Sequence, residues 1–212
     1  MCQITAHGAI PLPADALASL QREFRACRCV RIPSLLAPAL LARLQREVAA
    51  AAFVDRAHGS ISTELCMVRN ACLGTLNFLA NDPAMLGFVE AVTGCPRLTS
   101  FVGRVYRLDA SRGHYDSWHA DIDAGHEVGL SLNLSDQPFD GGVFEIRRVG
   151  TPQPLASHAN VVPGDAILFS IAADLEHRVT PMRGAAPKTA FAGWFGGARD
   201  YRDVVHQRTR DL

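Results

Sequence analysis

Residues 117 to 123, with the sequence SWHADID, carry an imidazole and a carboxylate two positions apart, at His119 and Asp121. On a β-strand, side chains two residues apart point to the same face, so a strand here would place the two side by side. One nitrogen and one oxygen ligand suit a divalent transition metal, and a third ligand from a distant strand would complete a facial triad. Because a His-x-Asp pair is also common as a surface hydrogen bond, the rest of the chain has to support a metal site.

A third ligand is expected from a late strand, and His177 in the segment DLEHRVTPM is the best candidate. Asp123 and His126 compete for a place in the ligand set. Asp123 would share a strand face with Asp121, but it lies one strand step further from His119 and is expected at the rim of the site. Four other histidines have no partner at ligand spacing and are expected at the surface: His58, His114, His158 and His206.

The composition is that of one ordinary globular domain. The chain has 212 residues, and 21 Lys and Arg balance 21 Asp and Glu, so no basic block indicates nucleic-acid binding. No apolar run reaches the roughly 20 residues of a membrane helix, and the N-terminus has no secretory pattern. The six cysteines are scattered without a CxxC motif, which favours reduced thiols in a cytoplasmic protein.

The hydrophobic period changes halfway along the chain. Residues 14–27, 38–53 and 81–94 have helical spacing, whereas 55–75 are polar with two glycines and are expected to be mostly loop. From residue 98 onwards short β-rich runs alternate with turns, and in 127–135 three leucines alternate strictly with polar residues. The pattern predicts one α+β domain, with residues 1–97 as mainly helical support, 98–196 as a β-core and 197–212 as a C-terminal tail.

The order of motifs in the second half resembles that of the iron(II)- and 2-oxoglutarate-dependent dioxygenases, most closely their prolyl-4-hydroxylase-like branch. The shared order over about residues 98–196 is His-x-Asp, a Gly-Gly strand, Pro-Gly-Asp, His-Arg-Val-Thr-Pro, a basic residue and Trp-Phe. The resemblance implies a double-stranded β-helix, or jelly roll, with Fe(II) bound by His119, Asp121 and His177. It also implies 2-oxoglutarate as co-substrate, with ascorbate as a candidate reductant.

The resemblance also implies contacts to the co-substrate. In the family an Arg or Lys about ten positions after the second histidine binds the far carboxylate. Here that position is Pro187, so Lys188 is preferred, with Arg183 as the alternative. Tyr106 matches a tyrosine that hydrogen-bonds the co-substrate, and Asn133 is a further candidate if its strand face lines the barrel mouth.

The expected activity is hydroxylation by a 2-oxoglutarate-dependent dioxygenase, because Asp121 stands where related halogenases lack the carboxylate. The expected substrate is an amino-acid residue of a peptide or protein, a free amino acid or a small metabolite. Two alternatives stay open: a cupin-like metal enzyme that does not use 2-oxoglutarate, and a non-catalytic β-helix binding module.

Overall fold

The computed structural model describes residues 3–10, 13–123 and 125–197. The expected C-terminal tail, 197–212, therefore lies outside the described residues except for its first position. Four α-helices and one 3-10 helix are present: α1 Ala14–Cys27, α2 Pro38–Ala49, α3 Ala71–Ala80, α4 Pro83–Thr93 and η1 Ala110–Arg112. The strands of the first half are β1 Gln3–Thr5, β2 Gly8–Ile10, β3 Cys29–Ile32, β4 Phe53–His58 and β5 Ser62–Met67.

The second half is made of strands. They are β6 Ser100–Leu108, β7 Tyr115–His119, β8 His126–Asn133, β9 Asp140–Gly141, β10 Phe144–Arg148, β11 Pro154–His158, β12 Ala166–Ser170, β13 Leu175–Val179, β14 Met182–Arg183 and β15 Lys188–Gly196. The expected α+β class is confirmed, and the first half contributes β3, β4 and β5 to the main sheet as well as the helices. Strict alternation in β8 is confirmed too, but both of its faces are buried from Val128 to Asn133.

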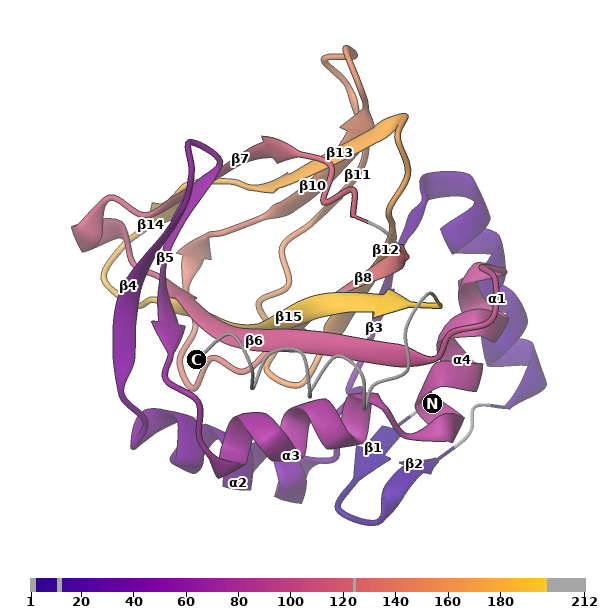
Figure 1. Ribbon diagram of the computed structural model, residues 1–212, viewed down its shortest axis with the longest axis horizontal. Coiled ribbons are helices and arrows are strands. Elements are labelled where there is room, and N and C mark those ends of the chain that lie inside the picture. The colour runs from indigo at the N-terminus through magenta and orange to yellow at the C-terminus, as the bar shows by residue number, and fades with distance from the viewer. Residues whose placement is uncertain (1–2, 11–12, 124, 198–212) are drawn as a thin grey trace.

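One antiparallel sheet dominates the fold, in the order β11-β10-β13-β7-β5-β6-β15-β8-β12-β3, with β4 added beside β5. The sheet curls, so that β7, β13, β10 and β11 form one layer and β6, β15, β8 and β12 form the other (Figure 1). The rings of Phe144 on β10 and Phe169 on β12 are 4.7 Å apart between these layers. The space between the layers is therefore where side chains from distant strands meet.

The helices cover the outer face of the layer that contains β6 and β15 (Figure 1). The C-terminal end of α3 and its C-cap residue support the backbone of β6 with two amide side chains one turn apart. Asn77 accepts from Gly103 N at 2.9 Å and donates to its carbonyl at 3.3 Å, and Asn81 does the same for Phe101 at 2.8 Å in both directions. These bonds satisfy backbone groups of β6 where β5 does not pair with it, and thus fix the strand that carries Arg104 and Tyr106.

Two expectations from the sequence are wrong. Residues 55–75 are not mostly loop: they complete the hairpin β4–β5 and begin α3. Residues 117–123 are not one strand, because β7 ends at His119 and Asp121 has a left-handed backbone with φ of 52°. Aspartate tolerates this conformation better than most residues, so the chain turns at Asp121 and not two residues later.

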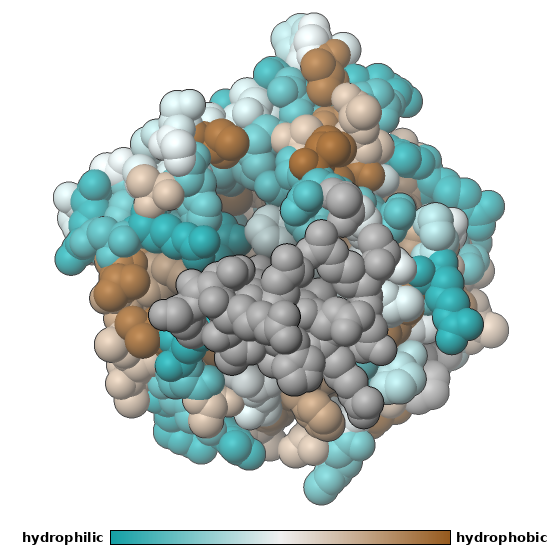
Figure 2. Space-filling view, viewed as in Figure 1, coloured by the Kyte–Doolittle hydropathy of each residue, from teal (hydrophilic) through white to brown (hydrophobic). Residues whose placement is uncertain are grey.

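The surface features are ordinary. Hydrophobic residues on the face in Figure 2 form small separate groups between hydrophilic ones.

Within the described ranges, none of the helices has the length and apolar character that crossing a membrane requires. Five cysteines lie in the described part of the chain, and all are free thiols: Cys27, Cys29, Cys66, Cys72 and Cys95.

Candidate metal centre and its cavity

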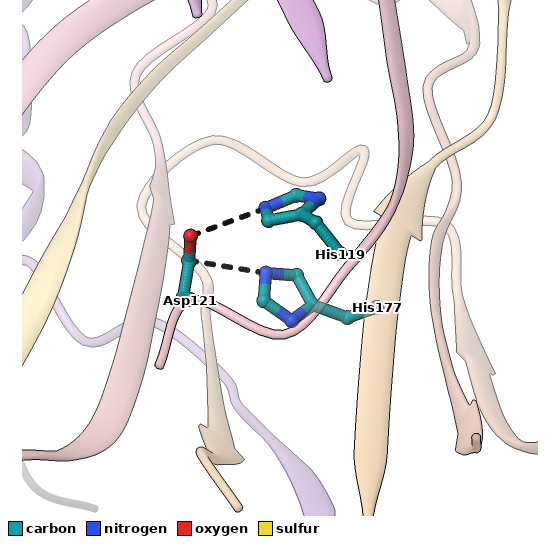
Figure 3. Close-up of side chains that lie close together, drawn as sticks. All are labelled: His119, Asp121 and His177. Carbon is teal, nitrogen blue, oxygen red and sulfur yellow. Dashed lines mark ion pairs between the residues drawn. The ribbon is translucent and has the colours of Figure 1, made fainter. Parts of the chain in front are cut away.

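The pairing of β7 with β13 brings the two histidines of the expected triad together. His177 is the direct partner of His119 in this antiparallel pair, and their ring centroids are 4.3 Å apart. Asp121 lies just past the end of β7, and its carboxylate faces both rings (Figure 3). Its Oδ1 is 3.3 Å from His119 Nε2, and its Oδ2 is 3.3 Å from His177 Nε2.

This donor set fits a transition metal. The ligand atoms of His119, Asp121 and His177 all lie within 4.8 Å of one another. Metal–ligand bonds of about 2.0–2.2 Å at right angles require donor atoms about 3 Å apart, and the Asp121 oxygens lie 3.3 Å from each imidazole Nε2. Two imidazoles and one carboxylate that occupy one face, with the other positions open, are typical of non-haem Fe(II) oxygenases.

Neighbouring groups hold the ligands in a binding orientation. His119 Nδ1 is 2.7 Å from the carbonyl oxygen of Ser117, which favours the tautomer that leaves the Nε2 lone pair free for a metal. Trp194 on β15 donates its indole N–H to Asp121 Oδ2 at 2.7 Å. Asp116 lies 3.5 Å from His119 Nδ1 and accepts from the backbone N–H of Val179, so it ties β7 to β13 beside the site.

The electrostatics of the ligands reflect their mutual contact. Burial disfavours the charged form of His119, but the hydrogen bond to Asp121 and the charge of Asp116 outweigh it and raise the pKa of the imidazole to about 9. Burial also opposes the ionised form of Asp121, yet its hydrogen bonds to His119 and His177 hold the pKa of the carboxyl well below its usual range. The carboxylate is therefore ionised and ready to bind a cation.

The triad opens into a cavity of about 220 Å³ between the two layers. Its walls differ in chemistry. Apolar side chains form one part: Leu130, Phe144, Phe169 and Val179. Charged and polar side chains form another part: His58, Ser62, Glu64, Arg104, Tyr106 and Ser131. Such a cavity suits a ligand that has both an apolar body and a polar group.

The expected co-substrate residues lie in different places. Tyr106 lines the cavity, and burial raises the pKa of its phenol, which therefore remains a hydrogen-bond donor. Lys188 is 1% exposed at the start of β15, where its Nζ donates to the carbonyl of Gly142 at 2.7 Å. It shares a strand face with Ala192 and Trp194, which line the cavity, but Lys188 itself does not. Burial lowers the pKa of Lys188 to about 8.

Two further candidates lie away from the cavity walls. Both ends of the Asn133 amide bond to the protein: Nδ2 donates to the carbonyl of Asn160 at 2.8 Å, and Oδ1 accepts from Ser135 N at 2.8 Å. Asn133 thus connects β8 to a neighbouring loop. Arg183 on β14 is exposed and lies 3.4 Å from Asp140. The position of Arg183 leaves Lys188 as the better candidate of the two.

Sequence reasoning missed several cavity residues. His58, which was expected at the surface, lines the cavity, and so does Trp194, which also donates to Asp121. Arg104 was not singled out at all, although its side chain lines the cavity and pairs with Glu64. A signal existed only for Arg104, since Arg104 and Tyr106 are two residues apart in a β-rich run and therefore share a face.

Comparisons with known proteins place this architecture. No protein-family model and no curated protein sequence matches the chain. A 2OG-Fe(II) oxygenase family oxidoreductase from Burkholderia pseudomallei superposes with a TM-score of 0.64 at 19% identity, over 88% of this chain and 93% of that one. A prolyl-4-hydroxylase from Pseudomonas putida gives 0.60 at 17% identity, over 86% and 100%. The fold is that of the 2-oxoglutarate- and Fe(II)-dependent oxygenases.

The expected jelly-roll core is thereby confirmed. The same fold is found in the α-ketoglutarate-dependent epimerase SnoN of nogalamycin biosynthesis, with a TM-score of 0.62 at 18% identity, over 88% of this chain and 82% of that one. Proteins of this architecture thus include both a hydroxylase and an epimerase. The fold alone therefore does not determine the reaction type.

Proposed function

We propose that the protein is an Fe(II)- and 2-oxoglutarate-dependent oxygenase that hydroxylates a C–H bond. One observation carries the proposal: His119, Asp121 and His177 meet as a two-histidine, one-carboxylate triad at a cavity of about 220 Å³, on a fold typical of these oxygenases. In the overall reaction, substrate, dioxygen and 2-oxoglutarate give hydroxylated substrate, succinate and carbon dioxide. When bound, Fe(II) supplies the redox chemistry that couples the decarboxylation to C–H oxidation.

The chain's own residues bind and orient the reactants. The two Nε2 atoms and one oxygen of Asp121 would hold the metal, and Trp194 keeps the other oxygen of that carboxylate hydrogen-bonded. Phe169 and Phe144 pack against the His177 ring, with centroids 4.5 and 5.7 Å away, so this ligand has little rotational freedom and little contact with water. A rigid, partly dry ligand set of this kind would hold the metal at the wall of the cavity.

Lys188 is our candidate for the far carboxylate of 2-oxoglutarate. A buried ammonium has three N–H donors, and the hydrogen bond of Lys188 to the described protein engages one of them, at Gly142. Its lowered pKa means that the site lacks an anionic partner strong enough to offset burial, and a carboxylate would provide one. Tyr106, a buried phenol on the neighbouring strand, is the second candidate donor.

The test is succinate formation from 2-oxoglutarate by the purified protein with Fe(II) under air. Turnover should require Fe(II) and disappear in the Asp121→Ala variant. Mass spectrometry of substrates that stimulate turnover should find a gain of one oxygen atom. An unchanged product mass with inverted stereochemistry would instead indicate epimerisation, as in the SnoN relative by fold.

A cupin-like metal enzyme that does not use 2-oxoglutarate is the second candidate. The observation in its favour is that Lys188 does not line the cavity and already bonds to Gly142. In that case metal-dependent activity would persist without 2-oxoglutarate, and no succinate would form.

A further inference from the structure

The charged wall of the cavity is built around one ion pair. Arg104 on β6 donates through Nε to Glu64 Oε1 at 2.5 Å and through Nη2 to Glu64 Oε2 at 2.9 Å. Glu64 on β5 is 3% exposed, and its Oε1 also faces His58 Nε2 at 3.2 Å. Glu64 therefore has its acceptor oxygens engaged and would gain little from a further ligand.

Arg104, in contrast, has N–H donors that Glu64 does not engage. A guanidinium has five N–H donors, arranged as a side-on pair of nitrogens, Nε and Nη2, and an end-on pair, Nη1 and Nη2. Glu64 takes the side-on pair. The Nη1 group has no hydrogen-bond partner within the described ranges, and Arg104 lines the cavity. The end-on pair is thus a preformed two-donor fork for an acceptor that enters the cavity.

Two aromatic rings and Glu64 restrict the conformational freedom of the Arg104 guanidinium. The guanidinium carbon lies 5.5 Å from the centre of the Tyr106 ring and 5.8 Å from that of Trp194. Glu64 fixes the plane of the guanidinium and is itself buried, so Arg104 loses little conformational freedom when a ligand binds. The guanidinium is therefore already oriented at the cavity wall before a ligand binds, which suits a binding group.

The indole of Trp194 contacts both Arg104 and the triad residue Asp121. One edge of Trp194 donates to Asp121 Oδ2 at 2.7 Å, and Arg104 stands over the same ring system. An acceptor bound by Arg104 would therefore lie in the same cavity as the metal-binding carboxylate, on the other side of a shared indole contact. The apolar side chains Phe144, Phe169 and Val179 lie in the same cavity and would receive the body of the ligand.

We propose that Arg104, oriented by Glu64, binds the carboxylate of the primary substrate, and that this substrate is a small acid with an apolar body whose reacting carbon reaches the triad. This inference rests on the proposed oxygenase function and adds the substrate class to it. A carboxylate matches the end-on fork in geometry and charge. A cationic group does not match this edge of Arg104, which offers only N–H donors.

The probes are two matched pairs of acid and primary amide: 3-phenylpropanoate with 3-phenylpropanamide, and hexanoate with hexanamide. Binding is measured calorimetrically under argon with Fe(II) and 2-oxoglutarate saturating, so that the metal positions for the co-substrate are filled. At least one acid should bind wild type about ten- to a hundred-fold more tightly than its amide, as a charge-assisted pair of hydrogen bonds predicts.

The variants separate binding from folding. Arg104→Gln alone would leave the buried Glu64 uncompensated, so the informative variant is Glu64→Gln/Arg104→Gln, in which both charges are removed. It should lose the preference for acid over amide, whereas Glu64→Gln alone should keep or increase it, because the whole guanidinium becomes available. Arg107→Gln is the matched control, since Arg107 lies on the other face of β6 over Phe53.

Three results would overturn the inference. The first is that neither acid binds wild type more tightly than its amide, and the second is that the double variant keeps the preference. The third is that the double variant weakens 2-oxoglutarate binding as strongly as acid binding, which would assign Arg104 to the co-substrate. Succinate formation without added acid tests the oxygenase function separately, so either hypothesis can fail alone.

Discussion

Replacing Lys188 with Met should have opposite effects on stability and on co-substrate binding. Burial lowers the pKa of Lys188 from 10.5 to about 8, a shift of about 2.5 units at about 1.36 kcal/mol each. At pH 7 the folded state therefore carries a cost of about 3 kcal/mol for holding the ammonium. Methionine removes this cost but leaves the buried Gly142 carbonyl without its donor, which costs about 1–3 kcal/mol.

The net result is a metal-free protein that is about 1 kcal/mol more stable at pH 7, with a melting temperature higher by roughly 2–4 °C for a domain of this size. The sign changes with pH. Because the folded pKa is below the unfolded one, wild type gains stability between about pH 8 and 10.5, where the unfolded chain binds the extra proton. The advantage of Lys188→Met should therefore be greatest below pH 8, vanish about one pH unit above it, and become a disadvantage towards pH 10.5.

The same substitution should raise the apparent 2-oxoglutarate constant about ten- to a hundred-fold, since an ion-paired hydrogen bond of roughly 1.5–3 kcal/mol is lost. In wild type, kcat/KM for 2-oxoglutarate should fall about tenfold per unit above pH 8, as Lys188 loses its proton in the free enzyme. The Lys188→Met variant should not show this decrease of kcat/KM above pH 8.

The assays are thermal unfolding of the metal-free protein across pH and 2-oxoglutarate titration at saturating Fe(II). Arg183→Ala is the control, because Arg183 is exposed and its loss should change the co-substrate constant little. An unchanged 2-oxoglutarate constant in Lys188→Met, together with lower stability, would mean that Lys188 is a structural lysine. A large effect of Arg183→Ala would move the co-substrate contact to that residue.

Three further outcomes are expected. Changing any triad residue to Ala should abolish Fe(II)-dependent succinate formation while circular dichroism stays native; activity retained in Asp121→Ala but lost in Asp123→Ala would show that the ligand assignment is wrong. Asn81→Ala should lower the free energy of unfolding in urea by about 1–3 kcal/mol, because Phe101 N–H and its carbonyl lose their partner; an unchanged midpoint would show that water replaces the amide. All six cysteines should react as thiols in the denatured protein without reductant, and mostly protected sulfurs would refute the prediction of a reducing compartment.

The sequence by itself determined the elements that have local signals. Asp82 caps α4, Pro83 opens it and Gly94 ends it with φ of 69°, all as their side chains and backbone preferences dictate. The strand β8 could equally be predicted, because apolar and polar residues alternate along its sequence. The triad residues were also readable, since their types and order along the chain suffice to identify a resemblance.

Local signals failed where conformation depends on a partner. The polar residues of β4 and β5 look like a loop, but they pair with each other, and β5 also bonds to β6 and β7. Asp121 was placed on a strand that in fact ends two residues earlier, because strand ends are set by where neighbouring strands stop. No local sequence signal indicates that His177 lies opposite His119, because this contact depends on the register between β7 and β13.

Only the tertiary structure decided what surrounds the triad. Glu64 and Arg104 are 40 residues apart, Trp194 and Asp121 are 73 apart, and Lys188 and Gly142 are 46 apart. Each contact depends on which strands are neighbours in the curled sheet, and strand order is a property of the whole chain. The sequence therefore determined which residues could hold a metal, whereas the closure of the sheet decided which charged side chains line the cavity and which, like Lys188, are buried behind it.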